Sequence, residues 1–191
     1  MKKLFILLTL IFSLTVNANA ETKRIISGNV DAKITIIAYE SLTCSHCANF
    51  HKDVYPQLKK DYIDTGLAKI EFRHFPLDIA AFNASKISQC KQTQSLEILE
   101  SLYSNQQNWV KGSTVDEVND HLRKFILKEG FNIDFEKCIN NKEIEDFVLN
   151  DRIEGTKKFK VNATPTIIIN NKKFEKSLNY KNLKKSLEKL I

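Results

Sequence analysis

One stretch, residues 33–51, limits what this chain can fold into more than any other. Its apolar run Ile34–Tyr39 is rich in β-branched side chains and predicts a buried strand. After a short connection, Thr43 is placed to cap a helix that starts at Cys44, by accepting a hydrogen bond from an unpaired backbone N–H group. The expected local structure is a strand, a tight turn, and then Cys44-Ser45-His46-Cys47 on the first turn of a helix.

This position favours redox chemistry at the two cysteines. A thiolate is the reactive form of cysteine, and the positive end of a helix stabilises it by about 0.3 to 2 kcal/mol. Because one pKa unit corresponds to about 1.4 kcal/mol, the helix alone lowers the pKa of Cys44 by at most about 1.5 units. Further lowering requires donors inside the motif, for which His46 and the thiol of Cys47 are the candidates. The three-residue spacing places both sulfur atoms on one side of the turn, close enough to form a disulfide.

The alternative to a redox dithiol is half of a zinc site. Structural zinc usually requires a second pair of cysteines or histidines at matching spacing. Cys90 and Cys138 are isolated in the sequence, and His51 lies on the same segment as the first pair. The pattern therefore favours a redox pair, and no metal site is predicted.

Residues 1–20 predict a secretory signal peptide. They begin with Lys2 and Lys3, continue with the mostly apolar run Leu4–Val16, and end in the small-residue pattern Ala18-Asn19-Ala20. An uncleaved membrane anchor is the alternative, although the run is short for a span. Export to an oxidising compartment, the periplasm, would permit disulfides. Loss of the two lysines lowers the net charge from +6 to +4, and because no basic and aromatic cluster remains, nucleic-acid binding is not predicted.

The remaining 171 residues, 21–191, have the length of one domain. Pro56 falls inside a helical pattern and predicts a restart of the helix near Tyr55. No convincing strand is found in residues 78–159, and a helical block is predicted at about 78–150, with Ser113 or Thr114 capping one helix. The other expected elements are an edge strand within 24–32, a strand at 67–75, helices at 79–93, 96–109, 115–129, 135–140 and 143–158, a hairpin of 167–169 with 172–174 around Asn170-Asn171, and a final amphipathic helix at 180–191.

The order of these pieces resembles the thioredoxin fold with a helical insertion, and more closely the DsbA-like family of exported thiol oxidases. The resemblance covers residue 24 to the end of the chain. Besides the two-cysteine motif, it is carried by the matching stretches Gly28–Ala32, Tyr62–Gly66, Phe72–Leu77 and Ala163-Thr164-Pro165-Thr166. The implied fold is α/β, thioredoxin-like, with an inserted helical subdomain.

The resemblance also implies roles for particular residues. In the family the first cysteine forms a mixed disulfide with substrate and the second resolves it, which carries over to Cys44 and Cys47. The proline that matches Pro165 is cis and lies against the dithiol, and the backbone of the preceding residue, here Thr164, pairs with an extended substrate peptide. The redox-active disulfide takes the place of a cofactor. The implied partners are reduced, unfolded exported proteins and a membrane protein of the DsbB type that re-oxidises the dithiol.

One departure from the fold's pattern concerns proton transfer. Many thioredoxin-fold enzymes have a buried acid six positions before the first cysteine, where this chain has Ala38. Glu40 is two residues later and lies on the same face if the strand persists. Glu40 is therefore either the proton-transfer residue from a shifted position or a solvent-facing side chain near the helix start.

The second cysteine pair, Cys90 and Cys138, lies on predicted helical segments. In an exported protein such a pair most often forms a structural disulfide, and some DsbA-like proteins have a second, non-catalytic one inside the helical block. Closing the loop of 48 residues from 90 to 138 would stabilise the fold by about 4 kcal/mol. A second redox pair is the alternative.

His51, His74 and His121 have no partners visible in the sequence and are expected to be surface or packing residues, and Trp109 is expected in the core.

The sequence thus predicts a periplasmic, monomeric thiol–disulfide oxidoreductase that donates its Cys44–Cys47 disulfide to exported proteins. A reductase or isomerase on the same fold is one alternative. An exported metal-binding carrier that uses Cys44, Cys47 and a histidine is the other.

Overall fold

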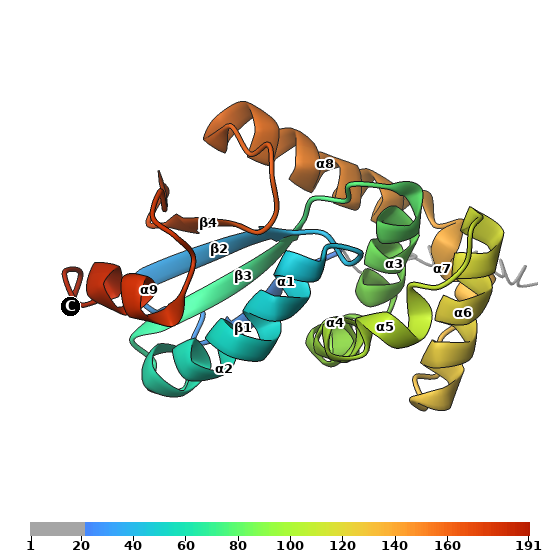
Figure 1. The fold of residues 1–191 in the computed structure, drawn as a ribbon, viewed down its shortest axis with the longest axis horizontal. Coiled ribbons are helices and arrows are strands. Elements are labelled where there is room, and N and C mark those ends of the chain that lie inside the picture. The colour runs from blue at the N-terminus through green and yellow to red at the C-terminus, as the bar shows by residue number, and fades with distance from the viewer. Residues whose placement is uncertain (1–21) are drawn as a thin grey trace, which may run out of the picture.

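The computed structural model describes residues 22–191, so the predicted signal peptide at 1–20 lies outside the described residues. A five-stranded mixed sheet with the order β1-β3-β2-β4-β5 forms its centre (Figure 1). The central strand β2 (Ile34–Glu40) pairs in parallel with β3 (Ala68–His74) and antiparallel with β4 (Thr166–Ile169). The edge strands are β1 (Ile25–Gly28) and β5 (Lys172–Lys173).

Both faces of the sheet are covered by helices, which explains the continuous apolar run in β2. Side chains alternate along the strand, so Ile36 and Ala38 face one cluster of buried residues while Ile37 and Tyr39 face another. The first face is covered by α1 (Ser45–Asn49), α2 (Tyr55–Leu58) and α9 (Tyr180–Leu187). The second is covered by α8 (Lys142–Phe159), which contributes Phe159 to the second cluster.

The segments α1, η1, α2 and η2 follow one another without a break from Ser45 to Ile63 and form one continuous helix, called here the first covering helix. This helix has two wide turns. A π-helical turn, η1 (Phe50–Val54), separates α1 from α2, and a second, η2 (Lys59–Ile63), follows α2. The restart expected near Tyr55 is confirmed, since α2 begins there with Pro56 in its first turn. The wide turn directs the consecutive residues Phe50 and His51 into the interior, whereas a regular α-helix separates neighbours by about 100°.

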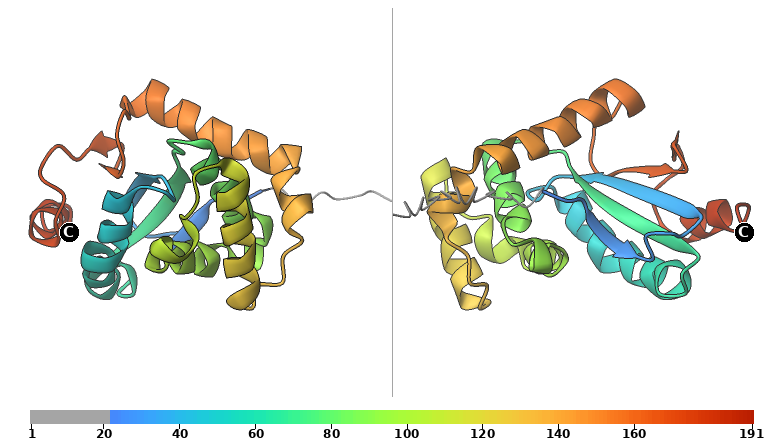
Figure 2. Two further views of the ribbon diagram at one scale, coloured as in Figure 1. Left: turned by 45° about the vertical axis from the view of Figure 1, so that its right-hand side comes forward. Right: turned by 180° about the vertical axis from the view of Figure 1, so that it is seen from behind.

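A block of helices is inserted between β3 and β4, beyond the carboxyl ends of the parallel strands β2 and β3 (Figures 1 and 2). It contains α3 (Ile79–Cys90), the 3₁₀ turn η3 (Gln92–Gln94), α4 (Ser95–Ser104), α5 (Gln106–Trp109), α6 (Val115–Lys128) and α7 (Phe135–Ile139), and leads into α8. The helical prediction is confirmed, with one break at Asn105 inside the helix expected at 96–109. Thr114 caps α6 through a reciprocal pair of hydrogen bonds with Glu117.

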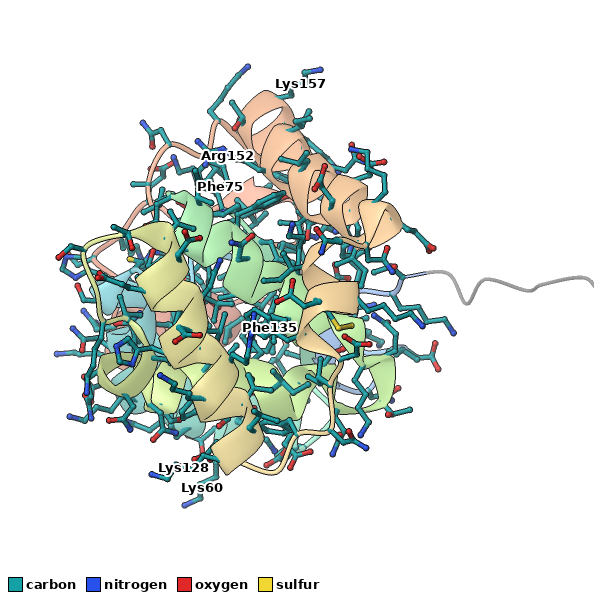
Figure 3. The ribbon with its side chains drawn as sticks, turned by 90° about the vertical axis from the view of Figure 1, so that its right-hand side faces the viewer. Lys60, Phe75, Lys128, Phe135, Arg152 and Lys157 are labelled. Carbon is teal, nitrogen blue, oxygen red and sulfur yellow. A yellow bond between two sulfur atoms is a disulfide. The ribbon has the colours of Figure 1, made fainter. Side chains whose placement is uncertain are left out.

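The buried residues of the inserted block belong to the same cluster as Ile36 and Ala38 of β2. The inserted helices and this face of the sheet therefore share one continuous hydrophobic core. Trp109 is fully buried, as expected, and its indole N–H donates to the carbonyl of Leu102 at 2.9 Å. Figure 3 looks onto this part of the molecule, with Phe135 between the helices and Arg152 of α8 lying over the ring of Phe75. Among residues 22–191, no helix has the length and apolar character needed to cross a bilayer.

The hairpin expected at Asn170-Asn171 is confirmed. Both residues have positive φ angles, 44° and 65°, which are the values of a tight type I′ turn and which asparagine tolerates better than most residues. The return strand is shorter than expected and ends at Lys173. The α/β architecture with a helical insertion is the one the sequence predicts.

Candidate active site

Cys44 lies at the point where the first covering helix begins. The helix starts at Ser45, one residue later than expected, and Cys44 itself occupies the N-cap position. Thr43 is therefore not the cap, and the prediction was wrong: its hydroxyl donates to Asp78 Oδ2 at 2.7 Å. The neutral thiol of Cys44 makes no capping hydrogen bond, but the N–H groups of His46 and Cys47 stabilise its thiolate. The thiolate thus takes the place of the oxygen that a capping side chain normally supplies.

The two cysteines have opposite acidities. A hydrogen bond from the Cys47 thiol is the largest cause that lowers the pKa of Cys44, to about 5, with further contributions from Thr164 and from the backbone N–H groups. Burial opposes this shift but does not cancel it. Cys47 is fully buried, and burial together with the nearby charge of Glu40 raises its pKa. Cys44 is therefore the accessible nucleophile at neutral pH, and Cys47 is a protected thiol.

The loop before β4 closes the site on one side. The Thr164–Pro165 peptide bond is cis, the isomer that the resemblance implies. The Cys44 thiol donates to the carbonyl of Thr164 at 3.4 Å, so this loop lies against the dithiol. A groove of about 450 Å³ begins here, and its lining includes Thr164, Pro165, His46, Phe50 and Leu178. The candidate substrate-binding residues Thr164 and Pro165 thus share one surface with the motif.

The sequence suggested the His46 side chain as a donor to Cys44, but the ring lies elsewhere. The side chain is exposed and lines the groove, and among the described residues no hydrogen bond involves its ring. The group of His46 that acts on Cys44 is its backbone N–H. This geometry assigns the thiolate-stabilising role to the backbone rather than to the imidazole.

Glu40 is buried behind the dithiol, with 3% of its surface exposed, so the solvent-facing alternative was wrong. Strand β2 persists to Glu40, which keeps this residue on the same face as Ala38. Its Oε2 lies 2.8 Å from Nε2 of His51, and its other oxygen has no hydrogen-bond partner among the described residues. Burial raises the pKa of the Glu40 carboxyl, and His51 opposes this shift.

Two histidines have partners that the sequence does not reveal. His51 bonds Glu40 and stacks on the ring of Tyr103, with a centroid distance of 4.0 Å. His74 is also buried, lies 3.0 Å from the Gln89 amide, and has its pKa lowered by burial to about 3. The only available signal for His51 was its position four residues after Cys47, on the same side of the helix.

The inserted helices hold the active-site loop through two polar contacts. The side-chain amide of Gln106, at the start of α5, donates to the carbonyls of Leu42 and Cys44 at 2.8 and 3.1 Å. Asp78 caps α3 through its Oδ1 and accepts the Thr43 hydroxyl through its Oδ2. Because these groups come from a different part of the chain, no local pattern could have identified them.

The other cysteine pair lies in the helical block. A disulfide joins Cys90 at the end of α3 to Cys138 in α7, with a distance of 5.6 Å between the Cα atoms. Cys138 is 1% exposed and belongs to the core cluster. Within residues 22–191, no group of three or more histidine, cysteine, aspartate or glutamate side chains could hold a metal ion.

Comparison with known proteins places this geometry in a family. A family model described as thioredoxin matches residues 20–189. The crystal structure of Wolbachia pipientis alpha-DsbA1 superimposes with a TM-score of 0.78 and 30% sequence identity, over 88% of this chain and 90% of that one. The chain belongs to the DsbA-like thioredoxin family. The expected fold class, thioredoxin-like with a helical insertion, is confirmed.

Curated relatives of this DsbA-like chain have names that refer to disulfide chemistry. Disulfide bond formation protein D of Bacillus subtilis is 27% identical over 174 residues, which are 85% of this chain and 74% of that protein. A Rickettsia bellii protein with a provisional protein-disulfide oxidoreductase name is 29% identical over 145 residues, or 75% of this chain. The match spans 55% of the length of that Rickettsia relative, so about half of such a protein corresponds to this chain.

Proposed function

We propose that this chain is an exported thiol–disulfide oxidoreductase that introduces disulfides into other proteins through Cys44 and Cys47. The observation that carries the proposal is the pairing of a partly exposed Cys44, whose pKa is lowered to about 5, with a fully buried Cys47. Stabilisation of the Cys44 thiolate favours the reduced form of the pair, which makes the disulfide form an oxidant. The family membership and the names of the relatives support the same reaction class.

The reaction proceeds through a mixed disulfide. A substrate thiolate attacks Cys44 Sγ of the Cys44–Cys47 disulfide; the new bond joins substrate and Cys44, and Cys47 leaves as a thiolate that takes up a proton. A second substrate thiolate then attacks the substrate sulfur of the mixed disulfide and displaces Cys44 as a thiolate. The substrate loses two electrons and gains a disulfide, and the enzyme becomes a dithiol. The low pKa of Cys44 makes it a good leaving group in the second step.

Substrate binding is assigned to Thr164 and Pro165. The Thr164 carbonyl already lies 3.4 Å from the Cys44 sulfur, so an extended peptide that pairs with this backbone would bring its cysteine next to Cys44. The adjoining groove offers apolar contact at Phe50 and Leu178. Because the contacts are mainly backbone and apolar, they fit the unfolded, reduced chains of many exported proteins.

Glu40 is assigned as the proton-transfer residue. The charge of Glu40 raises the pKa of Cys47, and burial favours the protonated form of Glu40. A protonated Glu40 gives its proton to the departing Cys47 thiolate. In the reverse direction, when the pair is re-oxidised, Glu40 takes the proton from Cys47 before Cys47 attacks.

The setting of this activity is the periplasm, reached by the signal peptide predicted at residues 1–20. A membrane protein of the DsbB type would return the dithiol to the disulfide form. The enzyme needs no other cofactor, because the electrons pass through the cysteine pair itself. As predicted from the sequence, it would act as a monomer.

The test is redox equilibration of the purified chain with glutathione, combined with oxidation of a peptide that contains two cysteines. We expect the Cys44–Cys47 disulfide to oxidise the peptide and to be reduced by a low ratio of reduced to oxidised glutathione. A pair that stays reduced under these conditions would instead favour the reductase or isomerase alternative. Retention of a stoichiometric metal ion by the dithiol, with no oxidation of the peptide, would support the metal-carrier alternative.

A further inference from the structure

A buried Glu40 that exchanges a proton with Cys47 in every cycle must itself exchange protons with solvent. Glu40 has 3% of its surface exposed and lies beneath the motif, where a bound substrate would cover the Thr164 side. The surroundings of the carboxyl therefore decide how quickly the proton on Cys47 can be replaced. This question rests on the proposed function and concerns the same site.

The side chain of His51 forms a hydrogen bond with Glu40. Its Nε2 lies 2.8 Å from Glu40 Oε2, and its Nδ1 has no hydrogen-bond partner among the described residues. A neutral imidazole that donates from Nε2 has a lone pair on Nδ1, so it can give one proton and accept another at its opposite end. Unpaired buried polar atoms are uncommon in folded proteins, and here one remains on each member of the pair.

The ring of His51 connects Glu40 with a second groove. This groove, of about 640 Å³, runs between the first covering helix and helices α4 and α5. His51 and the stacked Tyr103 belong to its lining, together with polar side chains such as Ser104, Gln106 and Lys52. A polar groove of this size holds water. Nδ1 of His51 is itself buried, so this water can act as donor or acceptor for the ring once a small movement of His51 or Tyr103 exposes that atom.

The two grooves lie on different faces of the same helix. His46, Phe50 and Asp53 line the groove on the Thr164 side, whereas Ser45, Ala48 and Lys52 line the groove on the α4 side. Within the described residues Asn49 is common to both linings. A substrate peptide bound against Thr164 would thus leave the second groove open to solvent.

We infer that His51 is a proton-relay residue that connects Glu40 to solvent in the groove beside α4 and α5. When the Cys47 thiolate takes a proton from Glu40, His51 passes its Nε2 proton to Glu40 and accepts one at Nδ1 from water. One proton enters from solvent and one reaches Cys47, so the sequence is balanced. During re-oxidation the same path carries a proton outward. The proton path and the peptide path are thereby separate, and turnover does not require the substrate to leave first.

Other titratable groups face the Glu40–His51 pair from several elements. Cys44 and Cys47 face Glu40 from the helix start, and Tyr103 of α4 both contacts Glu40 and stacks on His51. Tyr55 of α2 lies with its ring 5.5 Å from that of His51, and His74 of β3 is the register partner of Glu40. Burial raises the pKa of both tyrosines and lowers that of His74 to about 3, so these neighbours stay neutral at physiological pH.

The test measures the rate at which Cys47 displaces glutathione from a preformed Cys44–glutathione mixed disulfide. We expect His51→Ala to slow this step about 100-fold, as typical for loss of acid–base assistance, and added imidazole to restore the rate in a saturable manner. His51→Gln is the decisive second variant, because its amide can still donate to Glu40 but has no second nitrogen that accepts a proton. We expect it to be as slow as His51→Ala, without a change in the potential of the pair.

The matched control is His74→Ala, which removes another buried histidine with one polar partner. We expect it to lower the melting temperature without creating a response to imidazole. A His51→Gln variant with the wild-type rate would overturn the relay and leave His51 as a positioning residue for Glu40. A His51→Ala variant that does not respond to imidazole would overturn it as well. A wild-type chain that forms no mixed disulfide at all would overturn the proposed function, and this inference with it.

Discussion

The two cysteine pairs of this chain have the same chemistry available to them and very different surroundings. Cys44 and Cys47 are three residues apart at a helix start, with backbone donors on one side and a buried acid on the other. Cys90 and Cys138 are 48 residues apart and bridge two helices of the inserted block. The first pair has a partly exposed sulfur that a substrate can reach, while Cys138 is enclosed in the core.

This difference teaches that reactivity comes from the environment of a pair rather than from its spacing. Donors aimed at Cys44 stabilise its thiolate and so favour opening of the disulfide. At the second pair the disulfide instead closes a long loop and restricts the unfolded chain, which favours keeping it closed. Removal of the first pair is therefore expected to abolish activity, and removal of the second pair is expected to lower stability.

The largest expected effect follows removal of the first nucleophile. Cys44→Ser should abolish oxidation of a dithiol peptide, because no other partly exposed thiol in the described residues has a lowered pKa. Cys47→Ser should instead accumulate the mixed disulfide, since the resolving thiol is lost. Mass spectrometry of the chain after incubation with peptide distinguishes these outcomes. Residual oxidation by Cys44→Ser would mean that the second pair also exchanges disulfides.

The second pair should matter for stability and not for turnover. Replacement of both Cys90 and Cys138 by alanine should lower the free energy of unfolding by about 4 kcal/mol, the value expected for a loop of this length. Peptide oxidation should remain close to the wild-type rate. Urea unfolding and a peptide assay of the same sample provide both measurements. Loss of activity at unchanged stability would assign this pair to an electron relay.

The pH dependence of stability should differ between the two redox forms. The Cys44 pKa is lowered to about 5 in the folded dithiol form and is about 8.5 in an unfolded chain. The thiolate therefore adds stability that is fully present above about pH 8.5 and is lost as the pH falls through 5. The melting temperature of the dithiol form, relative to the disulfide form, should rise between pH 5 and pH 8. Parallel curves for the two forms would contradict the lowered pKa, as would alkylation of Cys44 with a midpoint near 8.5.

The smallest expected effect concerns His46. A ring that stabilised the thiolate by about 1.4 kcal/mol would change the glutathione equilibrium about tenfold, or about 30 mV, when replaced. Because the ring is exposed and the backbone N–H acts on Cys44, His46→Leu should change the Cys44 pKa and the potential of the pair by much less than this. Redox titration beside the wild type measures the change. A change of tenfold or more would show that the imidazole also contributes.

Local sequence signals predicted most of the architecture. Capping residues and periodicity located the helices of the inserted block, and the Asn170-Asn171 dipeptide located the hairpin. The start of α1 was placed one residue early, because the sequence does not show that Asp78 takes the hydroxyl of Thr43. These errors and successes follow one rule: features fixed within about four residues were predictable, and those fixed by distant contacts were not.

The candidate site illustrates the same limit. The motif Cys44–Cys47 could be identified from its spacing, but the environment of Glu40 could not. The π-helical turn η1 turns Phe50 and His51 inward together, and a turn of this kind depends on packing against the sheet and α4 rather than on local propensity. As a result the contact between Glu40 and His51, eleven residues apart, became visible only in the folded chain.

The short strand β5 has a consequence for the proposed function, in which the protein works among unfolded chains. Unpaired strand edges present rows of backbone N–H and C=O groups to any extended peptide nearby. On the β4 side, the sheet ends in a strand of two residues, both lysines, held by a tight asparagine turn. So short and charged an edge offers little template for further strands. In the proposed function, extended substrates would then be bound at Thr164 and released, rather than added to the sheet as further strands.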